Sequence, residues 1–305
     1  MREIKDVALL DLTGASGADV LDGVSRISNV ASILVPESLL GKLMSIPMEH
    51  VAATVPIPDG KKVKVMSGQI VLSGEALSAN TEDEILVTVG QLIVTSPVQQ
   101  QAHQQQIVAI GQVIAPTGSE TGLGAALTRM NGQVMYYPYT AGASVKPFTS
   151  STRLTGADLE NRAGQPSDIL VAAGQLLITG QVNKLGYEQI VALGPVIAPK
   201  QAEPILEGHV TSLSTGLTYY EAEPRLFEGK ETFSGAFFDL LNEPITLILD
   251  GKFTFADDVT SEQLKAKVRE IVFDGKLIAP RRLVPMLQVL ARQRSGKITT
   301  PDEDE

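Results

Sequence analysis

The sequence predicts a mainly β protein. We expect a single parallel β-solenoid with coils of about twenty residues, grouped in four units of about eighty residues, with short peripheral helices and a C-terminal capping helix. The first observation behind this fold class is a repeated segment. IVAIGQVIAP ends at Pro116, close copies IVALGPVIAP and IVFDGKLIAP end at Pro199 and Pro280, and a looser copy, NVASILVP, ends at Pro36. Successive prolines are roughly eighty residues apart, which is typical of a repeat architecture.

The second observation is a shorter period marked by glycine, at intervals of about twenty residues. Three runs, ILVTVGQLIVTSPV (85–98), ILVAAGQLLITG (169–180) and ITLILDGKFTF (245–255), each place a glycine between two β-branched or aliphatic segments that read as strands. A solenoid needs such glycines, because each coil turns a corner where a Cβ would collide with the next coil. The alternative fold is a row of separate α+β modules of about eighty residues.

The repeat sets the expected boundaries within a solenoid domain at 1–280. The units fall at about 5–61, 62–142, 143–224 and 225–280, and the distance from Gly14 to Gly74 makes the first unit short by one coil. A solenoid tolerates such a loss, because each layer contacts only its neighbours.

Short helices are expected just after the repeated proline, where apolar residues follow a helical period. These segments are ESLLGKLMSI (37–46), GLGAALTRM (122–130) and AEPILEGHV (202–210).

The fourth unit adds a stronger helix, TSEQLKAKVREIV (260–272), with Thr260 and Gln263 at the spacing of a capping box. After Pro280 the pattern predicts no further strand pair. Residues 281–296 are expected to form a helical cap, with its helix at 284–294, that prevents end-to-end pairing, and residues 297–305 an acidic tail.

Composition limits the function classes. The chain has 305 residues, a net charge of −10 and a pI near 4.9, so we expect no nucleic-acid partner, because a polyanion would be repelled. The apolar run near the N-terminus is too short for a signal peptide or a membrane span, so no membrane insertion is expected. The chain contains no cysteine. Together these features predict a cytoplasmic protein.

Sites for small molecules are weakly supported. His50, His103 and His209 lack the spacing of a metal site, and the glycines match no phosphate-binding motif, so neither a metal nor a cofactor is expected. Asp158 and Glu160 lie close together in sequence, as catalytic carboxylates of a β-helical enzyme would. A carbohydrate-active lyase or hydrolase using Asp and Glu is therefore the alternative function.

One feature favours a protein-binding scaffold instead. Successive residues in ILVTVGQLIV and ILVAAGQLLI are apolar, so both faces of these strands are hydrophobic. One face fills the solenoid, and the other must meet a helix, a second sheet or another copy of the chain. We expect this second face to bind the protein's own copies, as a homo-oligomer or filament, or another protein. The candidate residues are Leu86, Ile93, Leu170 and Leu177.

Basic residues near the C-terminus form a second candidate surface, for an acidic partner or another subunit's acidic tail. These residues are Arg281, Arg282, Arg292 and Arg294.

In its coil length and its Val- and Ile-rich coils the expected architecture resembles the bactofilins, which are cytoplasmic bacterial cytoskeletal solenoids. The resemblance implies a non-enzymatic, self-assembling protein. The four-coil superperiod, the inserted helices and the C-terminal cap depart from the uniform short core of that family.

Overall fold

The computed structural model describes residues 2–14, 16–78, 84–99, 106–213 and 216–303, and for residues 293–295 it describes the backbone alone. The protein is mainly β, with 52% strand in all-parallel sheets joined by short helices, which confirms this part of the predicted fold class. Within the described ranges, no helix is long and apolar enough to cross a membrane. The chain divides into two compact units, 1–147 and 148–305, which are treated separately below.

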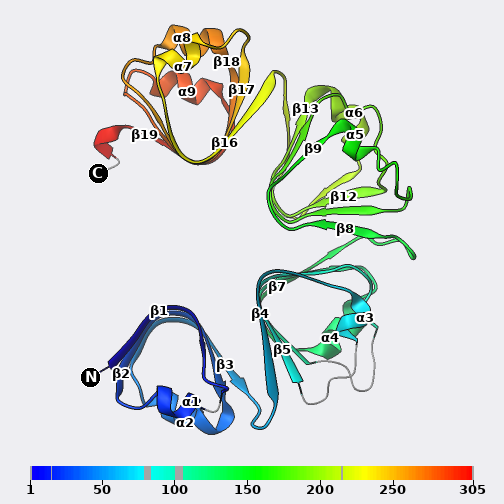
Figure 1. The fold of residues 1–305 in the computed structure, drawn as a ribbon, viewed down its shortest axis with the longest axis vertical. Helices are drawn as coiled ribbons and strands as arrows, with labels where there is room; N and C mark the ends of the chain where they lie inside the picture. Colours follow the sequence, from blue (N-terminus) through cyan, green and yellow to red (C-terminus); the bar gives the residue numbers. More distant parts are fainter. Residues whose placement is uncertain (1, 15, 79–83, 100–105, 214–215, 304–305) are drawn as a thin grey trace. The chain divides into compact units, whose positions relative to one another are not determined.

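Unit 1 contains two stacks, each a group of parallel strands joined by short helices (Figure 1). Stack 1 has the strand order β1-β2-β3 and stack 2 the order β4-β5-β6-β7. Stack 1 comprises β1 (Arg2–Asp11), α1 (Gly17–Val20), β2 (Val24–Pro36), η1 (Glu37–Leu39), α2 (Leu40–Met44) and β3 (Met48–Ile57). Stack 2 comprises β4 (Lys62–Leu72), α3 (Gly74–Leu77), β5 (Glu84–Val94), β6 (Gln106–Pro116), α4 (Glu120–Ala126) and β7 (Leu127–Tyr137).

Stack 3 consists of two four-stranded sheets, because its strands are interrupted at the corner. The first sheet has the order β14-β12-β10-β8, from β8 (Val145–Phe148), β10 (Ile169–Ala172), β12 (Gln189–Ala192) and β14 (Val210–Ser212). The second has the order β15-β13-β11-β9, from β9 (Thr152–Thr155), β11 (Leu176–Thr179), β13 (Val196–Pro199) and β15 (Leu217–Tyr220). The helices are α5 (Gly156–Leu159), η2 (Lys200–Ala202) and α6 (Glu203–Leu206).

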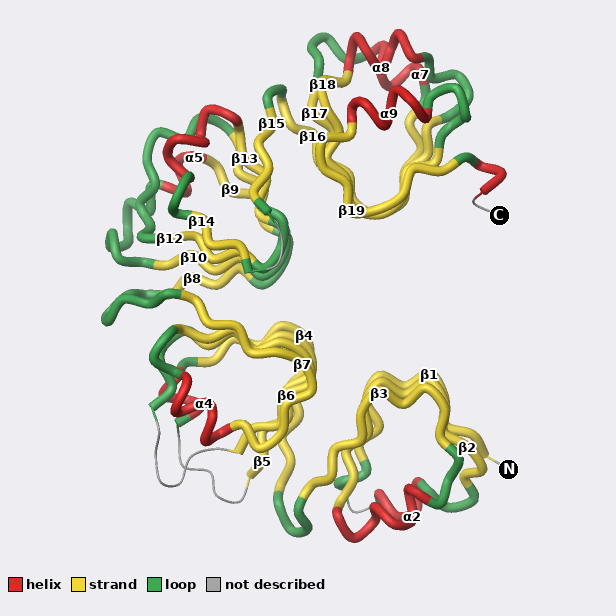
Figure 2. The backbone as a smooth tube through the Cα atoms, turned by 180° about the vertical axis from the view of Figure 1, so that it is seen from behind, coloured by secondary structure: helices red, strands yellow, loops and turns green. Residues whose placement is uncertain are grey.

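Stack 4 has the strand order β16-β17-β18-β19, and its three α-helices lie opposite the bend of the sheet (Figures 1 and 2). Its elements are β16 (Glu223–Phe233), α7 (Gly235–Asp239), β17 (Ile245–Phe255), α8 (Ser261–Lys267), β18 (Val268–Ile278), α9 (Val284–Leu290) and β19 (Ala291–Thr299), and η3 (Pro301–Glu303) follows. The side chains enclosed by sheet and helices form the core, which in this stack is centred on Phe233, Phe238, Phe253 and Phe255.

Glycines line up at the bend of the long strands, as the sequence predicts. Gly68, Gly90, Gly111 and Gly132 occupy matching positions in β4 to β7. A Cβ on Gly111 would lie 2.0 Å from the carbonyl oxygen of Gly90, and Gly111 has a φ of +127°. Both the close approach and the backbone angle exclude other residues, so the glycine period follows directly from the bend.

The strand pairing departs from the prediction of one continuous stack over residues 5–280. Among the described residues, the repeated proline segments lie in separate sheets, within β2, β6, β12 to β13, and β18. In every stack this segment belongs to the last strand but one, and stack 1 has three strands where the others have four layers. The interior strands need apolar side chains on both faces, which explains why the repeat is clearest there.

The expected helices exist, but they are shorter than the sequence predicts. The helix expected at 260–272 ends at Lys267, because Val268 and Ile271 belong to β18. Its capping box is confirmed: Thr260 Oγ1 accepts a hydrogen bond from the backbone N–H of Gln263 at 3.1 Å, and Gln263 Oε1 accepts one from the N–H of Thr260 at 2.9 Å.

The C-terminal cap predicted at 281–296 is only partly present, because its helix begins at 284 as predicted but is followed by a further strand. Helix α9 ends at Leu290, and residues 291–299 form β19, which pairs in parallel with β18. The sequence ARQRSGKIT carries little apolar signal, but it matches IVFDGKLI in register, with Gly296 beside Gly275 and Lys297 beside Lys276. The same helix and strand alternation therefore continues to the end of stack 4.

Neighbouring stacks within each unit pack side by side through the outer faces of their sheets. In unit 1, the buried Leu34, Val55 and Ile57 of stack 1 pack with Val87 and Val108 of stack 2. In unit 2 a second cluster joins Leu177, Ile197 and Tyr220 to Ile248 and Val272. These contacts account for strands that are apolar on both faces, because the outer face is covered by another stack of the same chain.

Candidate interaction surfaces

The four apolar residues proposed from the sequence as an interaction face are buried within the chain. Leu86 is 3% exposed, Leu177 1%, and Ile93 and Leu170 are fully buried. Leu86 and Leu170 belong to the cores of stacks 2 and 3, and Leu177 lies in the cluster shared by stacks 3 and 4. The expected exposed ladder is therefore absent at these positions, because the chain itself covers them.

Two of the four basic residues near the C-terminus, Arg282 and Arg292, make contacts within the fold. Arg282 donates hydrogen bonds to the carbonyl oxygens of Asp257 and Val259, the latter at 3.0 Å. Arg292 contacts Glu221 at 3.3 Å and Glu270 at 2.9 Å. Arg281 is exposed, and the side chain of Arg294 lies outside the described part of the structure.

Glu270 is a fully buried acid that sequence reasoning missed. One of its oxygens accepts hydrogen bonds from the backbone N–H of Glu221 at 2.7 Å and from Thr246 Oγ1 at 3.0 Å, and the other pairs with Arg292. The network ties the connection between stacks 3 and 4 to strands β18 and β19. Its signal in the sequence was a single acid inside the apolar run VREIVF, since an acid there requires a buried partner.

The acidic pair considered for catalysis has local structural roles. Asp158 accepts hydrogen bonds from the backbone and side chain of Thr155, both at 2.7 Å, and these bonds hold the pKa of the Asp158 carboxyl below its usual range. Glu160 pairs with Arg162 at 2.7 Å. A general acid needs a raised pKa, whereas the pKa of Asp158 is lowered, so this residue is poorly suited to that role.

The three histidines lie in different parts of the chain. His50 lies in β3, His209 precedes β14, and His103 lies outside the described residues. No group of three or more metal-ligating side chains occurs in the described ranges.

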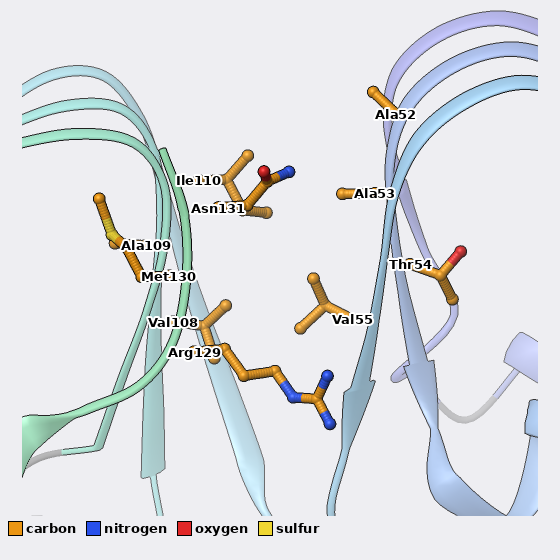
Figure 3. Close-up of a pocket in the computed structure, with 10 residues that line it drawn as sticks. All are labelled: Ala52, Ala53, Thr54, Val55, Val108, Ala109, Ile110, Arg129, Met130 and Asn131. Atoms are coloured by element: carbon orange, nitrogen blue, oxygen red, sulfur yellow. The ribbon is translucent and has the colours of Figure 1, made fainter. Parts of the chain in front are cut away.

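A groove lies between the two stacks of unit 1 (Figure 3). Its volume is about 290 Å³, and it is lined by residues 52–55 of β3, 108–110 of β6 and 129–131 of β7. Val55, Val108 and Ile110 supply apolar side chains, Thr54 and Asn131 supply polar ones, and Arg129, which is exposed, contributes its one cationic group. Such a lining can hold an apolar or anionic group, but it offers no acid and base pair for catalysis.

Stacks 2 and 4 each carry a column of identical side chains directly after the corner glycines. After the glycines of stack 2, the amides of Gln69, Gln91 and Gln112 form a chain of hydrogen bonds, 3.1 and 2.9 Å long. In stack 4 the equivalent positions are lysines, paired in register from strand to strand: Lys230, Lys252, Lys276 and Lys297. Such columns display identical groups at the spacing of strands, about 4.8 Å.

The core clusters of stacks 2 and 4 are less completely covered at the ends of the stacks than in their interior. In stack 4 the core residues that stay partly exposed come from the first strand and helix or from the last helix and strand: Phe227, Phe237, Met286, Leu290, Ala291 and Ile298. Stack 2 shows the same pattern, with Met66 and Leu72 in β4 and Leu127, Met130, Val134 and Tyr136 in β7. In the described part of the chain, the end strands β4, β7, β16 and β19 each pair on one side only.

Comparison with known proteins adds no identification: no family model, no curated protein and no solved structure matches this chain.

Proposed function

We propose that the protein is a non-enzymatic scaffold that binds protein partners, first of all its own copies. In this proposal each stack is a short parallel β-solenoid, in which a coil consists of strand, corner, strand and helix. The support is that paired residues lie about 20 to 24 positions apart along the chain and keep this offset through each stack. A cytoplasmic location remains part of the proposal, supported by a composition without cysteine.

The observation that carries the proposal is that, in the described part of the chain, the end strands of the stacks pair on one side only. An end strand offers a row of backbone N–H and C=O groups, and here it is accompanied by half-covered core side chains such as Phe227 and Ile298. Sheet edges of this kind pair readily with another chain. The route to assembly therefore differs from the lateral apolar face that the sequence suggested.

The alternative from the sequence, a carbohydrate-active enzyme using Asp and Glu, gains no support from these contacts. Asp158 serves the first turn of α5, and Glu160 serves an ion pair with Arg162.

The test of the scaffold proposal is the mass of the purified protein. We expect light scattering after size exclusion to show a mass that rises with concentration, and electron microscopy to show oligomers or filaments. A monodisperse monomer across the whole accessible concentration range would contradict self-assembly.

A further inference from the structure

We infer that stack 2 forms the contact between copies, in which β4 of one copy pairs in parallel with β7 of another. This inference rests on the proposed scaffold function and names the stack and the two end strands that it uses. Three properties of these strands support it: an open corner glycine, apolar side chains that match in register, and a column of glutamines that continues from one copy to the next.

The pairings within stack 2 fix the register of such a contact, because each strand continues the columns of the strand before it. Gly68, Gly90, Gly111 and Gly132 form the corner column. A Cβ on each of the last three would lie 1.7 to 2.3 Å from the carbonyl oxygen of the glycine one layer before, whereas nothing lies within 4 Å of the place for a Cβ on Gly68. Gly68 of a second copy can therefore lie next to Gly132, as the glycines do within the stack.

In this register the core-facing apolar side chains of the two end strands lie against each other. The column that begins with Ile70, for example, continues through Leu92 and Val113 to Val134. The pairs formed between copies are Met66 with Met130, Ile70 with Val134, and Leu72 with Tyr136. All of these side chains except Ile70 are only partly buried in the single chain, whereas Leu92 and Val113 are fully buried. Adding a layer would bury them as well, and burial of apolar surface favours association.

The glutamine column has the same direction throughout the stack. Gln69 Nε2 donates a hydrogen bond to Gln91 Oε1 at 3.1 Å, and Gln91 Nε2 donates one to Gln112 Oε1 at 2.9 Å. Gln133 is next in the column and is exposed, as is Gln69. Gln133 Nε2 can therefore donate to Oε1 of Gln69 in a second copy. Columns of amide side chains of this kind stabilise parallel, in-register strands.

The positive charges of the two end strands do not meet in this register. Arg129 lies in the column of Val65 on the outer face of the sheet, and Lys64 lies in the column of Leu127 on the core face. Lys64 is exposed, and its aliphatic stem can cover Leu127 while its ammonium group stays in water. The contact thus places no two like charges side by side.

Stack 1 leaves room for a second copy added at β7. Its strands lie beside those of stack 2: Leu34 of β2 packs with Val87 of β5 and Val108 of β6, and β3 lines the groove with β6 and β7 (Figure 3). A copy added at β7 is displaced by the four layers of stack 2, and stack 1 has only three strands. Repeated addition of this kind joins two different surfaces, so it produces filaments unless the rotation closes a ring.

The test is a double-mutant cycle between Gln69 and Gln133. Two layers separate these residues within one copy, so they are direct neighbours only across the contact between copies. Gln133→Glu and Gln133→Lys are each combined with Gln69→Lys, and the same two substitutions in the wild-type background are the matched controls. Circular dichroism and thermal unfolding check that the variants fold. If Gln69→Lys does not fold, the exposed pair Ser67 and Asn131, one position before the corner, takes the same substitutions.

In the Gln69→Lys background we expect Gln133→Lys to need about a tenfold higher concentration for assembly than Gln133→Glu, because lysines would then face each other at every contact. High salt should reduce this difference. In the wild-type background the two variants should differ by less than about threefold, because residue 133 then faces a neutral amide. Light scattering over a concentration series measures all five proteins, including the wild type.

Two results would overturn the inference and leave the scaffold function in place. In the first, the wild type assembles but the effect of residue 133 is the same in both backgrounds. In the second, Gln133→Glu and Gln133→Lys both weaken assembly in both backgrounds, as a symmetric contact of β7 with β7 would require. If the wild type is monomeric throughout, the inference and the scaffold function are both overturned.

Discussion

The corner glycines carry the tightest constraint on single residues. At Gly111 a side chain would have to overlap the carbonyl oxygen of Gly90, which belongs to the neighbouring strand and cannot move without breaking the pairing. At Gly41 in α2, by contrast, nothing lies within 4 Å of the position of a Cβ, and the residue is exposed. The same residue type is thus required in one place and replaceable in the other.

We therefore predict opposite effects for the same substitution at these two sites. Gly111→Ala should lower the free energy of unfolding by about 2–4 kcal/mol, because it combines backbone strain with a clash. Gly41→Ala should raise it by about 0.5–1 kcal/mol, because alanine favours a helix over glycine. Urea denaturation measures both, and a Gly111→Ala protein as stable as the wild type would show that the corner is not as tight as described.

The corner glycines show what the sequence alone can predict about single residues. A glycine at a fixed interval within apolar runs needs a local, steric reason, and the bend supplies it. The burial of Leu86 and Leu170 was not predictable in the same way. Their alternation shows that both strand faces are apolar, but which surface covers the second face depends on residues far away in the sequence.

The strands and their connections are held by specific ion pairs as well as by apolar packing. Glu221, in the short connection between β15 and β16, pairs with Arg269 at 3.1 Å and with Arg292 at 3.3 Å. The hydrogen bond from Arg269 and the charge of Arg292 hold the pKa of Glu221 below its ordinary value. The ionised carboxylate is thus favoured in the folded protein.

This shift predicts how stability depends on pH. A group whose pKa is lowered on folding stabilises the protein above its ordinary pKa, and the contribution is lost as the pH falls through the lowered value. Glu221→Gln should therefore be less stable than the wild type near pH 7, and the difference should disappear in acid. Thermal unfolding from pH 7 to pH 3 measures this, with Glu243→Gln as the control for the lost charge. A difference that does not change with pH would contradict it.

Among the helices and strands of stack 4, α8 could be predicted from the sequence and β19 could not. The capping box of α8 could be predicted, because Thr260 and Gln263 have a distinctive spacing. The last strand could not, because at the end of a stack one edge has no neighbour in the described chain, and its positions no longer need apolar residues. The charged ARQRS segment reflects this end position. The signal that remained in the sequence was the Gly-Lys pair at 296–297, which repeats Gly275 and Lys276 of the strand before it.

Within each unit the two stacks share buried residues, so their stabilities are coupled. Val87 in β5 is fully buried and packs with Leu34, Val55 and Ile57 of stack 1. Its neighbour in sequence, Leu86, belongs to the core of stack 2, so successive residues of one strand serve the two interfaces. The sequence suggested that strands with two apolar faces bind other molecules. In the structure, the second face of β5 packs against another stack of the same chain.

This coupling yields a prediction for unit 1. Val87→Thr keeps the shape of the side chain but places a hydroxyl in the apolar contact, at a cost of about 1–3 kcal/mol. Because the contact joins two stacks, hydrogen exchange should become faster in β1 to β3 as well as in β4 to β7. The control is Val71→Thr in β4, where the side chain is 38% exposed and the change should be within about 0.5 kcal/mol. Faster exchange confined to stack 2 would show that the stacks of unit 1 unfold independently.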